Sequence, residues 1–127
     1  MEKQGKSNNY GIDLRTRTKQ FAVRILRLAD SLPTKNSAQI ICKQVSRSGT
    51  SVGAHYREAF RAKSDADFIS KVEGALQELD ETTYWLELLA ESGIVKIELL
   101  KDLINEANEL MAIFITIVLN VKKKKNK

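Results

Sequence analysis

The stretch "RSGTSVGAHYREAFRAKS" (residues 47–64) decides the fold, because its spacing is helical while its middle is crowded with small residues. Those small residues are Ser48, Gly49, Ser51, Gly53 and Ala54. Each glycine lowers the intrinsic stability of a helix by roughly 1 kcal/mol relative to alanine, so another contribution must offset the loss. We predict that the offset is close packing, in which a neighbouring helix approaches this stretch.

A large side chain of that neighbour, Tyr84, Trp85 or Leu86, is expected to fill the gap over the small residues. The polar members of the stretch are expected to hydrogen bond to the local backbone or across to the neighbouring helix. His55, the only histidine of the chain, is expected to be a hydrogen-bonded residue at the edge of the core. Contact of His55 with a partner subunit or a nucleic acid is the alternative.

Outward from this stretch, apolar residues recur at steps of three and four, which is the spacing of one helix face. The expected core positions are Leu14, Phe21, Ile25, Leu28, Leu32, Ile41, Val45, Ser48, Val52, Ala59, Phe68, Val72, Leu76, Leu79, Leu86, Ala90, Leu99, Leu103, Ala107, Leu110, Phe114 and Val118. Breaks fall at "SLPT" (31–34), "RAKSDAD" (61–67) and "ESG" (91–93). They divide the chain into four helices, the second starting near Asn36 and the third near Asp65.

Two of these breaks carry recognisable helix caps. Ser64 with Asp67 three residues later predicts a capping box, in which side chains satisfy orphan backbone donors. Gly93 is expected to end the third helix in a left-handed conformation. No alternating strand pattern occurs. We therefore predict an all-α fold, an antiparallel up-and-down four-helix bundle in one domain over 1–127. Residues 1–11 are expected to be a flexible lead and 122–127 a basic tail.

Charge is distributed unevenly along the chain. Residues 34–63 hold six Lys or Arg and one acidic residue, whereas residues 64–93 hold one Lys and eight Asp or Glu. One interpretation is that basic and acidic helices neutralise each other within one bundle. The other is that the acidic third helix faces a basic helix of another copy, as in a ring-shaped oligomer. Glu73, Glu81 and Glu87 are the expected interface residues.

Catalytic constellations are not expected. A carboxylate-bridged di-iron bundle needs histidines on two helices, and the chain has one. Cys42 precedes His55 by thirteen residues, which is roughly 20 Å along a straight helix and too far for a nucleophile and its base. The single cysteine also excludes a multi-cysteine zinc site. We therefore predict that the protein is not an enzyme and has no metal and no cofactor. The longest apolar run (110–119) is too short to span a membrane, so we predict no membrane span. A cytoplasmic location is expected.

The chain resembles the 23S ribosomal RNA intervening-sequence protein family over residues 46–95. The resemblance is carried by Arg47-Ser48, Glu58-Ala59, Asp67-Phe68-Ile69 and "ETTYWLELLAESG" (81–93). Where His55 stands, that family commonly has Asn. The resemblance implies a four-helix bundle, often a homopentameric ring, with a role related to nucleic acid or the ribosome. That family is also similar in fold to accessory proteins of diversity-generating retroelements, which bind nucleic acid and a reverse transcriptase.

Two functions remain open at the level of sequence. The first is non-enzymatic binding of RNA or DNA by an oligomer through its basic surface. The expected contacts are Arg15, Arg17, Lys19, Arg24, Arg27, Lys43, Arg47, Arg57, Arg61, Lys63, Lys122, Lys123, Lys124 and Lys125. The alternative is an accessory scaffold that binds another protein, such as a reverse transcriptase, with little nucleic-acid binding. Aromatic residues are only 6% of the chain and mostly fall on core stripes, so base stacking is poorly supported.

Overall fold

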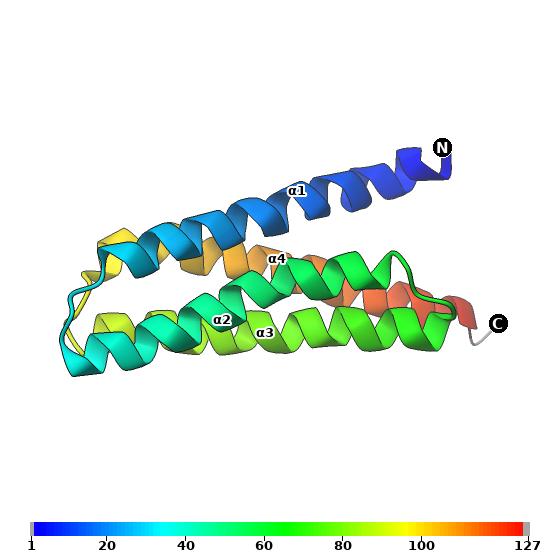
Figure 1. The fold of residues 1–127 in the computed structure, drawn as a ribbon. Coiled ribbons are helices and arrows are strands. Elements are labelled where there is room, and N and C mark those ends of the chain that lie inside the picture. Colours follow the sequence, from blue (N-terminus) through cyan, green and yellow to red (C-terminus); the bar gives the residue numbers. More distant parts are fainter. Residues whose placement is uncertain (1, 126–127) are drawn as a thin grey trace.

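The computed structural model describes the backbone of residues 2–125 and the side chains of residues 14–124. This part of the chain forms four helices and contains no strand: α1 (Glu2–Ser31), α2 (Asn36–Ala59), α3 (Asp65–Glu91) and α4 (Ile97–Lys125). The α1–α2 and α3–α4 connections lie at one end of the molecule and the α2–α3 connection at the other (Figure 1). The all-α fold with four helices is therefore confirmed.

Helices that follow one another in sequence pack side by side, and α1 and α4 contact each other less than these neighbouring pairs do. The candidate site lies between α1 and α2. The start of α1 extends away from the other helices (Figure 1). α1 begins at Glu2, so its helical backbone includes residues 2–11, the range of the predicted lead. α4 continues to Lys125 and includes most of the predicted tail.

The helix ends follow from local sequence. The backbone N–H of Asp67 donates to Ser64 Oγ at 3.0 Å, which confirms the N-cap. The Asp67 carboxylate accepts from the backbone N–H of Lys63 at 3.4 Å, one residue before the donor that a capping box would satisfy. At the other end of α3, Gly93 has a φ of +75°, and the N–H of Ile94 donates to Leu89 O. This is a Schellman motif, which confirms the predicted glycine cap.

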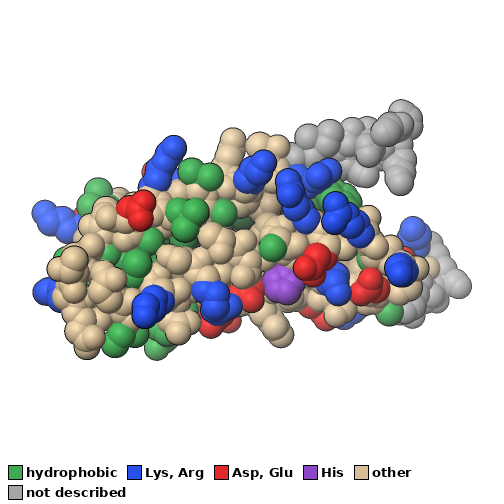
Figure 2. Space-filling model, in the orientation of Figure 1, with side chains coloured by type: hydrophobic (Ala, Val, Ile, Leu, Met, Phe, Trp, Pro, Cys, Tyr) green, Lys and Arg blue, Asp and Glu red, His purple; other side chains and the backbone are tan. Residues whose placement is uncertain are grey.

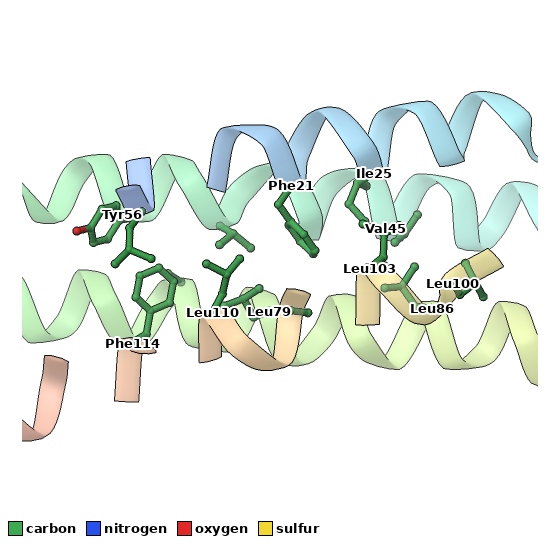
Figure 3. Close-up of a cluster of buried hydrophobic side chains, with 14 of the residues drawn as sticks. Phe21, Ile25, Val45, Tyr56, Leu79, Leu86, Leu100, Leu103, Leu110 and Phe114 are labelled. Atoms are coloured by element: carbon green, nitrogen blue, oxygen red, sulfur yellow. The ribbon is translucent and has the colours of Figure 1, made fainter. Parts of the chain in front are cut away.

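Residues from all four helices meet in one core (Figure 3). Phe21 and Ile25 come from α1, Val45 from α2, Leu79 from α3 and Phe114 from α4, and all are fully buried. One predicted core position is wrong: Leu99 is 73% exposed, and its neighbour Leu100 is buried instead.

The buried row of α4 accounts for part of its apolar character, and exposed apolar residues such as Leu99 and Leu119 make up another part. Leu100, Leu103, Ala107, Leu110 and Phe114 repeat at helical spacing and face the core. Among the described residues, Ile97–Lys124 is also the one segment with the length and composition of a membrane span. Core helices of soluble proteins share these features, so the composition of α4 is weak evidence for a membrane.

The small residues of α2 pack against α1 and α3 in different ways. A Cβ at Gly49 would come within 2.8 Å of the Ile25 side chain on α1. Ser48 Oγ lies 2.7 Å from Thr82 Oγ1 on α3, a buried hydrogen bond between helices. Close approach by a neighbour is thus confirmed, and so is the cross-helix hydrogen bond.

The prediction of which side chain fills the space over the small residues of α2 is wrong. α1 residues, not Tyr84, Trp85 or Leu86, meet the glycines, because Gly49 and Gly53 lie on the side of α2 that faces α1. Tyr84 is 54% exposed, while Leu86 belongs to the general core.

Candidate nucleic-acid interface

Arg15, Lys19 and Arg57 share one surface groove between α1 and α2. A hollow of about 420 Å³ is lined by these three residues with Thr16 and Gln20. An adjoining hollow of about 250 Å³ is lined by the same three cations with small residues of both helices, among them Gly53. We call the two together the α1–α2 groove. Among the described residues that line it, every charged side chain is a cation.

Small residues make this groove possible. A Cβ at Gly53 would lie 3.1 Å from Thr18 Oγ1, so the backbone of α2 comes close to α1 at this level. Ala22 of α1 and Ala54 of α2 line the groove with short side chains. The long side chains of Arg15 and Lys19 therefore rise from one wall, and Arg57 rises from the other. In Figure 2, Lys and Arg side chains gather next to the grey atoms, over the part of α1 that follows them.

An aromatic residue stands at one end of the groove. The guanidinium carbon of Arg15 lies 5.1 Å from the centre of the Phe60 ring, which is within the range of a cation–π interaction. Phe60 contacts Tyr56 edge-to-face, with ring centres 5.0 Å apart, and Tyr56 contacts Phe114 in the core. Burial raises the pKa of Tyr56 to about 12, an effect that the nearby Arg15 opposes.

Some predicted contact residues are neutralised within the chain. Arg17 donates from Nε and Nη2 to the two carboxylate oxygens of Glu106 at 2.9 and 2.7 Å, and from Nη2 to Glu109 at 2.9 Å. These bonds tie α1 to α4. Arg47 on α2 forms ion pairs with Glu78 and Glu81 on α3. The hydrogen bond to Glu81 is the main cause that raises the pKa of Arg47.

The other predicted cations lie outside the groove. Arg24 is half-buried, and the remaining ones are exposed: Arg27, Lys43, Arg61, Lys63, Lys123 and Lys124. Lys122 is also exposed and lies 3.5 Å from Glu73. The side chain of Lys125 falls outside the described residues. The structure thus brings together Arg15, Lys19 and Arg57 from the longer predicted set.

The predicted interface carboxylates differ from one another in their surroundings. Glu73 pairs with Lys122, and Glu81 pairs with Arg47, both within one chain. Glu87 is exposed and has no ion pair among the described residues. These pairs support the interpretation that basic and acidic helices neutralise each other within one bundle, at least around α2 and α3.

His55 lies at the edge of the core, between α2 and α3, as predicted. Its Nε2 is 3.7 Å from Glu78 Oε2 and its Nδ1 is 4.0 Å from Glu58 Oε1. Nδ1 is buried and has no hydrogen-bond partner, and the distance from Nε2 to Glu78 is too long for a hydrogen bond, so the expectation that His55 is hydrogen bonded is wrong. Gly74 leaves room for the ring, because a Cβ there would be 3.0 Å from Nδ1. Within the described part of the chain, no three His, Cys, Asp or Glu side chains gather as metal ligands.

Comparison with known proteins gives a consistent relationship. The model of the family described as 23S rRNA-intervening sequence protein matches residues 12–116. Among solved structures, the chain is similar to a protein with unknown function from the S23 ribosomal protein family of Bacteroides thetaiotaomicron. The two are 40% identical with a TM-score of 0.78, covering 82% of this chain and 96% of that one. A search among curated proteins finds no match.

Proposed function

Because the chain belongs to the 23S rRNA-intervening sequence protein family, we propose that it is a non-enzymatic protein that binds RNA or DNA through phosphates. The observation that supports this proposal is the α1–α2 groove, where Arg15, Lys19 and Arg57 converge without a lining carboxylate. Arginine and lysine are the side chains that most often contact phosphate oxygens. Contacts to phosphates carry no sequence information, so we expect weak sequence preference.

Exposed cations extend the groove into a wider basic surface. Arg61 and Lys63 follow Arg57 along the chain and are exposed. Lys123 and Lys124 are exposed at the end of α4. Each phosphate that these cations neutralise releases counterions, which makes affinity depend on salt.

The proposal includes an assembly of identical chains. The antiparallel up-and-down bundle is the expected subunit, and a closed ring of five subunits is the expected oligomer, located in the cytoplasm. A ring would place one groove on each subunit along a single polyanion and so raise avidity. Its repeated contact would be heterologous, pairing the acidic face of α3 with a basic face of the next copy.

A second function is supported by the outer face of α4. Ile115 and Leu119, one helical turn apart, are about half exposed there. Exposed apolar residues near one another are typical of surfaces that contact other proteins. An accessory scaffold that binds a protein such as a reverse transcriptase is therefore the alternative to direct nucleic-acid binding.

Fluorescence anisotropy with labelled RNA and DNA at several salt concentrations tests the leading proposal. We expect binding whose affinity falls steeply with salt, and whose log–log slope becomes shallower when residues 122–127 are removed. Absence of binding at about 50 mM salt and about 10 μM protein would contradict the proposal, since non-specific phosphate contacts alone give comparable affinities. The scaffold function would then lead. Replacing Ile115 and Leu119 with Ser would test it in a pull-down from the native host.

A further inference from the structure

Phe60 is an aromatic residue outside the core, at the end of the α1–α2 groove. It is 45% exposed, although the sequence placed the aromatic residues mostly on core stripes. Its ring contacts buried Tyr56 edge-to-face and lies beside Arg15, and these contacts limit its motion. An aromatic ring whose motion is already limited loses little conformational entropy when a flat ligand packs on it.

Two hollows of different character flank Phe60. On the Arg15 side lies the α1–α2 groove with its cations. Phe60 itself lines a separate hollow of about 440 Å³, which Phe68, Val121, Lys63 and Asp65 also line. We call it the Phe60 hollow.

The charges of the two hollows suit different parts of one nucleotide. The groove suits phosphates, because only cations among its charged lining residues face it. The Phe60 hollow is less suited to a phosphate than the groove, because Asp65 offsets the charge of Lys63 in its lining. Apolar rings beside a carboxylate instead suit a nucleobase, whose face stacks on aromatics and whose amino group donates to carboxylates.

We propose that Phe60 stacks on an unpaired base of a single-stranded nucleic acid whose phosphates lie in the α1–α2 groove. This inference rests on the proposed function and names its ligand class. In a duplex, bases are stacked on each other and their faces are not available to Phe60. The protein is therefore expected to prefer unpaired segments, such as loops and single-stranded ends, over continuous duplex. The preference is tolerant of sequence, because every base offers an aromatic face.

The test compares a labelled single-stranded oligoadenylate with a continuous duplex of equal length, using anisotropy. Phe60→Leu keeps apolar bulk but removes the aromatic face. We expect it to weaken single-strand binding about fivefold or more, while duplex binding changes less than about twofold, on the usual scale of base stacking. Phe60→Trp should retain or strengthen binding. The salt slope should be the same for each variant, because no charge is removed.

Tyr84→Leu is the matched control. Tyr84 is also an exposed aromatic held edge-to-face by a neighbour, Trp85, but it lies beside Asp80 and Glu81 rather than cations. Its loss should leave both affinities unchanged. Equal effects of Phe60→Leu and Tyr84→Leu, or no effect of Phe60→Leu, would overturn the stacking inference while phosphate binding stands.

The remaining outcomes are also decisive. A change in oligomer mass caused by Phe60→Leu would assign Phe60 to a contact between copies and overturn the inference. If the unmodified protein binds neither probe, the proposed function itself fails, which separates the two failures. Circular dichroism of each variant, with an unchanged helical spectrum, establishes that the affinity differences do not come from unfolding.

Discussion

Gly49 lies against Ile25 so closely that a Cβ at position 49 would come within 2.8 Å of two carbons of the isoleucine side chain. Ile25 is fully buried and β-branched, so it has few alternative rotamers with which to move aside. This contact brings α1 and α2 close together, as the approach of Gly53 to Thr18 does at the level of the groove where Arg15, Lys19 and Arg57 meet.

Gly49→Ala should destabilise the protein despite the better helix propensity of alanine. Propensity favours the substitution by roughly 1 kcal/mol, whereas overpacking a core costs typically about 1–3 kcal/mol. We expect a net loss of about 1 kcal/mol in the free energy of unfolding, measured with urea. In an Ile25→Ala background the same substitution should be neutral or stabilising. Destabilisation of equal size in both backgrounds would contradict the proposed contact.

The buried hydrogen bond between Ser48 and Thr82 should contribute to the pairing of α2 and α3. Thr82 Oγ1 donates to Glu78 O at 2.7 Å, so Ser48 is the donor to Thr82. Ser48→Ala should cost about 1 kcal/mol, and Thr82→Val about 1–3 kcal/mol because it leaves a buried hydroxyl without its partner. The double variant should cost less than the two single costs combined. Strict additivity in urea unfolding would mean that the bond contributes nothing.

Stability should fall at high pH because of Tyr56. Burial raises its pKa from 10.0 to about 12, so the folded state keeps a proton that the unfolded state releases. The unfolded state then binds fewer protons between these values, and stability decreases as pH rises through the window, by up to roughly 2 kcal/mol. Tyr56→Phe should lack this part of the decrease. Parallel stability curves for the two proteins from about pH 9 to about pH 12 would refute the assignment.

The surroundings of Glu87 and Glu81 lead to different expectations for charge reversal. Glu81 pairs with Arg47 in its own chain, whereas Glu87 is exposed and has no ion pair among the described residues. If α3 faces a basic surface of another copy, Glu87→Lys should lower the oligomer mass measured by light scattering. Glu81→Lys should affect the mass less, since that carboxylate already pairs with Arg47 in its own chain. A monomer mass for the unmodified protein would remove the ring, and a mass insensitive to Glu87→Lys would remove its electrostatic explanation.

Features that depend on neighbours in sequence were predictable. The cap at Ser64 and the left-handed Gly93 each follow from a few adjacent residues, and both are present. Which leucine at the start of α4 is buried was not predictable, because Leu99 and Leu100 are adjacent and identical in type. Only packing against the other helices decides that Leu100 is buried.

The candidate site was predictable only as a set of cations. Arg17 is separated from Glu106 by 89 positions, so its ion pair is invisible to local charge counts. The same holds for Arg47, whose partners lie on the next helix. The packing of the helices determines which cations are not paired with carboxylates and can contact a ligand. It also determines the exposure of Phe60.

The most direct test of the account removes two charges from the α1–α2 groove and compares the result with removal of two charges elsewhere. The groove variant is Lys19→Gln with Arg57→Gln. The control is Lys96→Gln with Lys101→Gln, which changes net charge equally at the end of the molecule where α3 joins α4 (Figure 1).

Anisotropy with labelled RNA over a range of salt concentrations provides the measurement. The groove variant should bind at least about tenfold more weakly, and its log–log salt slope should be shallower by roughly 1.4–1.8, the value for two lost phosphate contacts. The control should keep the slope of the unmodified protein. Equal weakening by both variants, or an unchanged slope in the groove variant, would contradict the claim that this groove binds the phosphate backbone.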